Sequence, residues 1–421
     1  MGINVLIIGS GGREHAIAWK LSQSPKLKKL WVLPGNAGIE DYAETVDIKE
    51  TDINAICKFV ENNTIDLTIV GPEIPLAAGI TDTLNHQGFR VVGPTKTAAQ
   101  LETSKSFAKK IMHENNIPTA HSETFTDAFL AKEYIHKLES LVVIKADGLA
   151  AGKGVTVCDN SKEAEAAIEK ILIKKAYGDA GTKILVEERM FGRETSAHAF
   201  TDGISVKHMP FSCDHKPVYD NNLGPNTGGM GVYSPPLWLS DEIRKDIEQN
   251  ITERIIKSMA QNKTPYTGIL YPGLMITKTG PRVVEFNARF GDPETEVLLP
   301  KLETDLLEIF DAIGDKRLSE IEVEWNNNAS VGVILASGGY PDSYEIGKRI
   351  HGLDNIDSNV QIFMSGVKSD ENNSLYTAGG RVLCLVASGS SIDEARELAY
   401  SNVNRISFEG MHYRTDIGSA S

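Results

Sequence analysis

The chain has 421 residues, of which 41% are hydrophobic and 24% charged, and its formal net charge is −14. A chain of this length is too long to fold around a single hydrophobic core, so we expect two to four domains. The acidic balance and the lack of a lysine- and arginine-rich block argue against nucleic-acid binding, and no apolar run approaches the roughly 18 residues of a membrane span.

Short apolar runs alternate with helical patterns over the first hundred residues. Strands are predicted at 4–9, 29–33, 67–72 and 90–94, with helices at 15–24 and 53–63. This alternation predicts a Rossmann-like parallel sheet over residues 1–103. Ligands of such sheets bind at the carboxyl ends of the strands, where the turns GSGGRE, PGNAG and GPE occur.

The middle of the chain, residues 104–325, is predicted to form a second α/β domain that begins with a helix over 103–116. Residues 120–192 within it are expected to be a mobile subdomain, with helices at 127–138 and 162–175 and strands at 141–145, 155–159 and 183–189. Further strands are expected at 195–200, 268–277 and 282–287, and a helix at 241–261. The loop 214–236 is long and rich in Gly, Pro and Asn, which is typical of a functional loop.

The last segment, residues 326–421, is predicted to be a small α+β domain. Strands are expected at 330–337 and 381–388, and a helix at 391–406. The stretch EVEWNNNAS at 322–330 marks the expected boundary.

The number and spacing of the cysteines indicate the redox state of the compartment in which the protein works. Cys57, Cys158, Cys213 and Cys384 are scattered, without the spacing of a zinc site. We expect buried thiols in a reducing compartment. The N-terminus MGINVLIIGSGG has no basic region before its apolar run, so it is expected to be a first strand rather than a signal peptide. These features predict a cytoplasmic protein.

The turn GSGGRE resembles a dinucleotide-binding fingerprint only in part. Gly9 and Gly11 fit the G-x-G-x-x-G pattern, but Glu14 stands at its third glycine. The second strand ends at Leu33 without the acid that would hold a ribose. The glycines still allow close approach to a phosphate, and Arg13 can grip it with two hydrogen bonds. A plain strand-to-helix turn is the alternative.

The stretch KADGLAAGKGV lies between two predicted strands. Gly148 and Gly152 are one residue too close for a Walker A loop, and Gly154 stands where Ser or Thr should hold magnesium. We therefore predict a hairpin that folds over a nucleotide, with backbone N–H groups, Lys145 and Lys153 contacting phosphates. A solvated hairpin with two surface lysines is the alternative.

Glu285 and Asn287 lie two residues apart on the predicted strand 282–287, so alternation puts both side chains on one face. Carboxylate and amide oxygens are hard ligands, suited to Mg²⁺ that bridges ATP phosphates. Arg289 continues this face and can stabilise charge on a transferring phosphoryl or acyl-phosphate group. The alternative is a polar strand face in water.

Two other groups carry weaker signals. Glu187 and Glu188 end a predicted strand, where one can bind a ribose hydroxyl; simple surface glutamates are the alternative. His198 is expected to be packed or hydrogen-bonded rather than catalytic. Order along the chain gives no Ser/His/Asp or Cys/His constellation.

Taken together, these stretches resemble the phosphoribosylamine–glycine ligase family, also called glycinamide ribonucleotide synthetases. The stretches that carry the resemblance are GSGGREHAIAWK, PGNAG, DLTIVGPEIPL, SKSFAKK, VIKADGLAAGKGV, GPNTGGMGVYSP, VEFNARFGDPETE and GGRVLCLVASG. They cover almost the whole chain in the family's order. The resemblance implies an ATP-grasp fold, preceded by the Rossmann-like domain and followed by the small α+β domain.

The resemblance also implies an activity. Such an enzyme joins glycine to 5-phosphoribosylamine in purine synthesis, giving glycinamide ribonucleotide, ADP and phosphate. It uses ATP with Mg²⁺ or Mn²⁺, and we expect a monomer. Phosphorylation turns a carboxylate oxygen of glycine into a leaving group, so positioning and charge neutralisation carry the reaction. Because the amine and the acyl phosphate are both labile in water, a closing loop is expected.

The resemblance assigns site residues in four groups. Nucleotide contacts are implied for Lys105, Lys145, Gly148, Gly152, Lys153, Gly154, Glu187, Glu188 and Glu194. Metal ligands are implied at Glu285 and Asn287, and catalytic positions at Arg289, Asp214 and Lys216. Substrate contacts are implied for Gly11, Gly12, Arg13, Glu14, Pro72, Glu73, Asn226, Thr227, Gly228, Gly229, Gly291, Asp292 and Pro293.

The chain departs from the family pattern at three places, one of which is His198, on a strand that is usually apolar at this position. The strand YPGLMI offers no further carboxylate for a metal, and Ala288 stands where many members have Cys. Two other readings stay open. A different ATP-grasp ligase or carboxylase would release ADP without glycine, and a non-catalytic nucleotide- or nicotinamide-binding protein would show no turnover.

Overall fold

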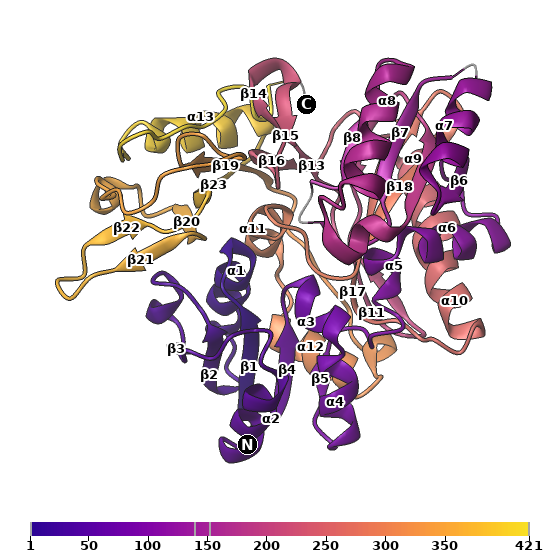
Figure 1. Cartoon of the computed structure of the whole chain (residues 1–421). Coiled ribbons are helices and arrows are strands. Elements are labelled where there is room, and N and C mark those ends of the chain that lie inside the picture. Colours follow the sequence, from indigo (N-terminus) through magenta and orange to yellow (C-terminus); the bar gives the residue numbers. More distant parts are fainter. Residues whose placement is uncertain (1, 139, 151–152, 420–421) are drawn as a thin grey trace.

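A parallel sheet of order β3-β2-β1-β4-β5 opens the chain (Figure 1). This structure is a computed structural model, and it describes residues 2–138, 140–150 and 153–419. The elements of this lobe are β1 (Ile3–Gly9), α1 (Gly12–Leu21), β2 (Leu27–Pro34), β3 (Glu44–Thr45), α2 (Ile53–Asn62), β4 (Leu67–Val70), α3 (Glu73–Ala78), α4 (Ile80–His86) and β5 (Val91–Val92). The predicted Rossmann-like layer is confirmed, because β1 pairs in parallel with both β2 and β4. Continuous apolar runs suit strands that are buried on both faces.

A second lobe, which we call the lid (residues 122–188), contains the antiparallel sheet β6-β9-β7-β8. The lid and the two helices before it consist of α5 (Gln100–Thr103), α6 (Lys105–Glu114), β6 (Ser122–Phe125), α7 (Ala128–Lys137), β7 (Val142–Ala146), β8 (Val155–Val157), α8 (Ser161–Ile168) and β9 (Ile184–Glu188). Asp127 and Asn160 cap α7 and α8 by accepting backbone hydrogen bonds. The lid has its own hydrophobic core between these helices and the sheet.

The central sheet has the order β10-β17-β11-β12, and β18 pairs with β17. Its strands are β10 (Arg193–Ser196), β11 (Ala199–Asp202), β12 (Val206–His208), β17 (Thr267–Thr277) and β18 (Gly280–Asn287); the helices around it are α9 (Asp241–Ile247), α10 (Arg254–Gln261), α11 (Glu294–Leu298) and α12 (Leu306–Gly314). The prediction of one strand over 195–200 is wrong. Pro272 of β17 has no N–H to donate, so the ladder breaks opposite Ala197 and His198 and leaves two strands.

The C-terminal sheet has the order β13-β16-β19-β23-β20. Its strands are β13 (Cys213–Asp214), β16 (Gly231–Ser234), β19 (Ala329–Ala336), β20 (Val360–Met364) and β23 (Arg381–Gly389); α13 (Ile392–Val403) packs on it, and the ribbons β14 (Pro217–Tyr219) with β15 (Leu223–Asn226) and β21 (Val367–Ser369) with β22 (Leu375–Thr377) project from it. β16 pairs with β19, so the long loop predicted at 214–236 contributes strands to the C-terminal sheet.

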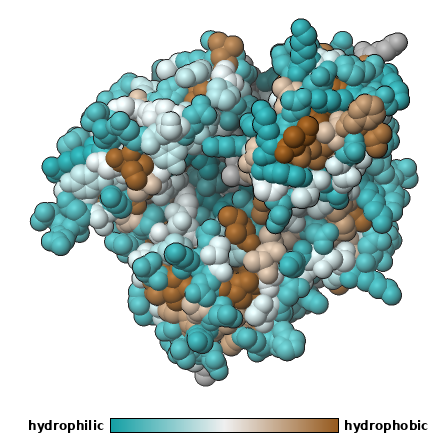
Figure 2. All heavy atoms as spheres, in the orientation of Figure 1, coloured by the Kyte–Doolittle hydropathy of each residue, from teal (hydrophilic) through white to brown (hydrophobic). Residues whose placement is uncertain are grey.

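The lobes surround a hollow. In the space-filling view the surface is recessed between the lid and the C-terminal sheet, and hydrophilic side chains surround this recess (Figure 2). All four cysteines are buried and free, as predicted. Over the described part of the chain, no helix combines the length and the apolar character needed to cross a bilayer.

Candidate active site

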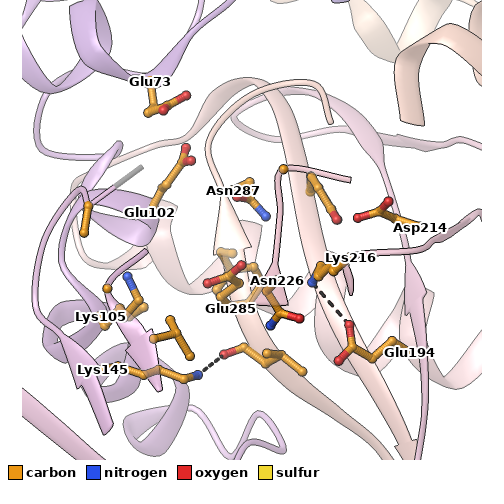
Figure 3. Close-up of a pocket in the computed structure, with 18 of the residues that line it drawn as sticks. Glu73, Glu102, Lys105, Lys145, Glu194, Asp214, Lys216, Asn226, Glu285 and Asn287 are labelled. Atoms are coloured by element: carbon orange, nitrogen blue, oxygen red, sulfur yellow. Dashed lines mark hydrogen bonds and ion pairs between the residues drawn. The ribbon is translucent and has the colours of Figure 1, made fainter. Parts of the chain in front are cut away.

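A cavity of about 790 Å³ lies where the lobes meet. It is lined by residues of the N-terminal sheet, the lid, β18, the loop before β16 and the C-terminal sheet. Of the residues implied by the resemblance, the lining contains Arg13, Pro72, Glu73, Lys105, Lys145, Gly148, Gly154, Glu187, Glu188, Glu194, Asp214, Lys216, Asn226, Thr227, Gly228, Glu285, Asn287, Arg289 and Asp292. Segments that are distant in sequence therefore meet in one site (Figure 3).

The strand β18 presents Glu285 and Asn287 to the cavity. Phe286 between them is 2% exposed and packs in the core, so the expected alternation is present. In the described part of the chain, the side chain of Glu285 forms no hydrogen bond or ion pair, which leaves its carboxylate free for a ligand. Burial works against its ionisation, but the charges of Lys216 and Lys105 outweigh this and lower the pKa of Glu285.

Arg289 lies just beyond β18 between two carboxylates. It pairs with Glu73 at 3.0 Å and with Glu102 at 3.1 Å, and its Nη2 donates to Asn287 Oδ1 at 3.3 Å. Burial disfavours the charge of Arg289, but Glu102 and Glu73 outweigh it and raise its pKa. The guanidinium is thus held in a fixed orientation beside Asn287.

Lysines of α6 and of the lid line one side of the cavity. Lys145 Nζ pairs with Glu187 Oε2 at 2.9 Å and donates to the carbonyl of Val284 at 3.0 Å. Lys109 lies 3.4 Å from the other oxygen of Glu187, and burial lowers the pKa of Lys109 to about 8. Lys105, at the start of α6, has no ion-pair partner among the described residues.

The two glutamates at the end of β9 already have protein partners. Glu187 is 2% exposed and held between two lysines, as described above. Glu188 pairs with Arg282 at 2.7 Å and accepts a hydrogen bond from the backbone N–H of His121. Both line the cavity. The two partners of Glu188 bond its Oε1 and leave Oε2 without a partner among the described residues, and Glu187 Oε1 accepts no hydrogen bond, so each glutamate keeps an oxygen for a ribose contact.

The glycine loop joins β7 and β8, which pair in an antiparallel manner. This confirms the predicted strand–loop–strand arrangement. A Cβ on Gly148 would lie 2.7 Å from the Cβ of Ala180, so the loop requires glycine there. Lys153 is exposed and outside the cavity lining, and its carbonyl accepts a hydrogen bond from Tyr177. Gly152 lies outside the described residues.

The segment after β13 brings Asp214 and Lys216 to the cavity. Lys216 Nζ lies 3.2 Å from Glu194 Oε2, which is the main reason why the pKa of Lys216 is raised (Figure 3). Burial, followed by the nearby charge of Glu294, raises the pKa of Asp214 well above its usual value. The side chains of Asp214 and Lys216 can therefore form hydrogen bonds with a substrate, as acceptor or as donor.

Several residues implied as substrate contacts lie behind the cavity wall instead. Glu14 folds into the crevice between β1 and β4, where a Cβ on Gly9 or Gly71 would overlap it. Its carboxylate accepts hydrogen bonds from Gly11 N at 2.7 Å and from Arg13 Nε at 2.6 Å. Glu14, which stands at the third glycine of the fingerprint, therefore bonds the N-terminal turn of α1. Absent from the cavity lining are Gly11, Gly12, Glu14, Gly229, Gly291 and Pro293.

The sequence did not single out Arg381 and Tyr340 of the C-terminal sheet and its following loop, although both line the cavity. Arg381 pairs with Asp292 at 2.9 Å and donates to the carbonyl of Gly228 at 2.7 Å. Tyr340 OH accepts a hydrogen bond from Gly228 N. The stretch GGRVLCLVASG carries the family resemblance but indicates no role for Arg381, because a contact between residues 153 apart in sequence has no local signal. Glu102 and Lys109 were missed for the same reason.

His198 is a packed residue, as expected. It is 1% exposed, its ring stacks on Tyr271 at 4.2 Å between centroids, and its Nε2 accepts a hydrogen bond from Gly291 N. Burial lowers the pKa of His198 to about 4, although Glu294 favours the protonated form.

This histidine makes the fold sensitive to acid. The unfolded chain takes up its proton near pH 6.5 and the folded chain only near pH 4, so between these values protons favour the unfolded state. We expect His198 alone to lower the free energy of unfolding by about 2 kcal/mol from pH 7 to pH 5. The variant His198→Gln keeps an acceptor near the position of Nε2 but does not titrate. Urea unfolding at both pH values should show a smaller loss for the variant; equal losses would contradict this assignment.

Comparisons with known proteins agree with this architecture. Residues 3–102, 103–295 and 330–420 match the N domain, the ATP-grasp (A) domain and the C domain of phosphoribosylglycinamide synthetase. Phosphoribosylamine–glycine ligases of Halalkalibacterium halodurans and Vibrio vulnificus are 46% and 45% identical, each over 99% of this chain and 97% and 98% of their own length.

Solved structures give the same result. The phosphoribosylamine–glycine ligase of Thermotoga maritima superposes with a TM-score of 0.85 at 32% identity, covering 98% of this chain and all of that one. A biotin carboxylase domain from Hydrogenobacter thermophilus shares the fold alone, with a TM-score of 0.76 at 14% identity over 98% of this chain and 92% of that one. The predicted fold, an ATP-grasp core between a Rossmann-like and a small α+β domain, is confirmed. The chain therefore belongs to the phosphoribosylglycinamide synthetase (phosphoribosylamine–glycine ligase) family.

Proposed function

We propose that this protein joins glycine to 5-phosphoribosylamine at the expense of ATP, giving glycinamide ribonucleotide, ADP and phosphate. The main support for this proposal is the set of residues that the cavity brings together, in a chain that belongs to this family. The cavity gathers the free carboxylate of Glu285, the amide of Asn287, the guanidinium of Arg289 and the lysines of the lid side. These groups suit phosphoryl transfer to a carboxylate, which depends on positioning and charge neutralisation.

ATP would lie between the lid and β18. Lys105 and Lys145 would contact its phosphates, and the glycine loop would close over them. The free oxygens of Glu285 and the amide of Asn287 fit Mg²⁺ or Mn²⁺, which would neutralise charge on the phosphates when bound. No further carboxylate is available on β17 at this position, so phosphate and water oxygens would complete the coordination.

The residues of the chain then act on glycine and the amine. Arg289, fixed by Glu73 and Glu102, would stabilise negative charge on the carboxylate as it becomes an acyl phosphate. Asp214 and Lys216 would orient glycine and the attacking amine. Arg13, Pro72 and Glu73 would contact phosphoribosylamine, with Asn226, Thr227, Gly228 and Asp292 on the opposite side. Closure of the lid would exclude water from both labile species.

Isotope transfer tests the acyl-phosphate route. With glycine labelled by ¹⁸O in its carboxylate, one label should appear in inorganic phosphate. The amine attacks the carbonyl carbon of the acyl phosphate, the bond from this carbon to the bridging oxygen breaks, and the labelled oxygen leaves with the phosphate. Labelled glycine should enter a product that carries a phosphate group. Unlabelled phosphate would rule out the proposed intermediate, while the fold assignment would stand.

The buried reduced cysteines support a cytoplasmic site of action, and we expect a monomer by gel filtration.

Replacement of Lys153 tests the closing loop. Lys153 is exposed, so Lys153→Ala should leave the free energy of unfolding within about 0.5 kcal/mol of the parent. If the loop closes over ATP, we expect the KM for ATP to rise about tenfold, which corresponds to the loss of one charge-assisted hydrogen bond. Lys162→Ala, an exposed lysine on α8, is the control. Unchanged kinetics with ATP would count against the loop assignment.

A further inference from the structure

The segment that carries Asp214, Lys216 and Asn226 has little hydrophobic anchorage of its own. We call residues 214–229 the substrate loop; its hairpin consists of β14 and β15. Among the strand residues of this hairpin, all of which the structure describes, only Val218 is buried, and β15 is exposed throughout. An isolated two-stranded hairpin is marginally stable in water. Its position must therefore be set by contacts from outside.

A C-terminal segment, residues 412–417, provides these contacts at the turn of the hairpin, and we call it the strap. At the other end of the substrate loop, Arg381 and Tyr340 bond Gly228. Arg414 of the strap is 1% exposed. Its Nη1 donates to the carbonyl of Pro217 at 3.0 Å and its Nη2 to Asn222 Oδ1 at 3.1 Å, so one side chain bonds the start of the hairpin and its turn. Asp416 pairs with Arg414 at 2.7 Å and accepts from Asn221 N at 2.8 Å.

A second set of bonds joins the strap to the same turn. Thr415 donates through its backbone N–H to Asp220 Oδ1 at 2.8 Å and through its hydroxyl to Asp220 Oδ2. The ring of His412 bonds the carbonyl of Val218 at 2.9 Å. Asn221 and Asn222 both have left-handed φ angles, 59° and 57°, which polar bonds of this kind help to hold.

The strap is itself a fixed part of the C-terminal domain. Arg396 of α13 donates to the carbonyls of Thr415 and Ile417, and Tyr400 OH donates to the carbonyl of Arg414. The side chain of Ile417 is fully buried in the C-terminal core. The hairpin is thus tied to a rigid element rather than to another loop.

The other end of the hairpin forms part of the cavity wall. The carbonyl of Lys216 accepts hydrogen bonds from the backbone N–H of Thr227 at 2.8 Å and from its hydroxyl at 2.7 Å. Lys216, Asn226 and Thr227 all line the cavity. A change in the tilt of the hairpin therefore shifts these side chains relative to Glu285 and Asn287, which lie on β18.

We propose that the strap positions the substrate loop. Asp220, Arg414 and Thr415 set where Lys216 and Asn226 lie, and so the affinity for glycine and phosphoribosylamine, without touching either substrate. This inference rests on the function proposed above. The KM for ATP should depend least on the strap, because the proposed phosphate and metal contacts lie on the lid, α6 and β18; of the implied nucleotide contacts, Glu194 pairs with the substrate loop through Lys216.

The test is Asp220→Ala in the full chain. Asp220 is at the surface end of the hairpin, so the fold should survive and the melting temperature should stay within about 2 °C. We expect the KM values for glycine and phosphoribosylamine to rise about tenfold, with less than about a twofold change in the KM for ATP. Asp220→Asn keeps one oxygen for the N–H of Thr415 and should recover most of the affinity. Arg405→Ala removes a surface ion pair with Asp357 in the same domain and should change nothing.

Hydrogen exchange of the same variants gives a readout that does not need activity. The amides of Asn221 and Thr227 should exchange faster in Asp220→Ala, while the amides of β18 stay protected. Unchanged KM values and exchange would overturn the proposal, and so would an equal rise of all three KM values together with a lower melting temperature. If the parent protein does not ligate glycine at all, the proposed function fails, and faster exchange confined to the substrate loop would still support the strap.

Discussion

Replacing Arg289 by alanine is expected to lower kcat by roughly a thousandfold, because removal of one preorganised charge donor costs up to about this factor. Arg289 lines the cavity beside Asn287 and is fixed by Glu73 and Glu102. The same change leaves both carboxylates without their cation, so the free energy of unfolding should also fall. Steady-state ADP release and urea unfolding measure the two effects.

Arg289→Lys separates catalysis from stability. The lysine keeps the positive charge between the carboxylates but loses the planar fork, so we expect most of the stability and little of the activity to return. Arg90→Ala is the matched control, because Arg90 also bridges two carboxylates, Asp311 and Asp315, and none of the three lines the cavity. A full recovery of kcat in Arg289→Lys would show that charge alone is needed, and normal kcat in Arg289→Ala would remove Arg289 from the mechanism.

Replacing Glu285 by glutamine is expected to reduce turnover by roughly a hundredfold to a thousandfold and to raise the Mg²⁺ concentration needed for half-maximal rate. The carboxylate has no hydrogen bond or ion pair among the described residues, so its loss breaks no protein contact. Stability should therefore stay close to that of the parent. Electron paramagnetic resonance of Mn²⁺ with ATP present measures metal binding independently of turnover.

The double variant Glu285→Gln with Asn287→Asp restores the charge one position along the same face. Partial recovery of Mn²⁺ binding would support a shared metal site at these two positions. If Glu285→Gln binds Mn²⁺ and ATP as the parent does and keeps its activity, Glu285 is not a ligand. A large loss of stability with intact metal binding would give it a structural role instead.

Local sequence patterns were enough to predict much of the fold. Continuous apolar runs and glycine-terminated strands predicted the parallel sheet, and period-two alternation placed Glu285 and Asn287 on one face. The interruption at Ala197 and His198 was missed, because it depends on Pro272 of a strand 75 residues away in sequence. Pairing partners of this kind are not encoded in the segment that they alter.

The candidate site, like the fold, was predictable from the sequence only in part. Residue types and spacing, together with the family resemblance, singled out 19 of the 42 described residues that line the cavity. They did not reveal which groups neutralise one another. Glu102 beside Arg289, Lys109 beside Glu187 and Arg381 beside Asp292 are all long-range partners, and each fixes a residue that was singled out. The position of Glu14 in the crevice after β1 likewise required the tertiary structure.

The proposed ligation is tested most directly by ADP release with ATP, Mg²⁺, freshly formed phosphoribosylamine and glycine, omitting each in turn. We expect ADP release only when both glycine and phosphoribosylamine are present. ADP release that does not need glycine, or no release with the complete mixture, would contradict the proposed ligation of glycine to phosphoribosylamine.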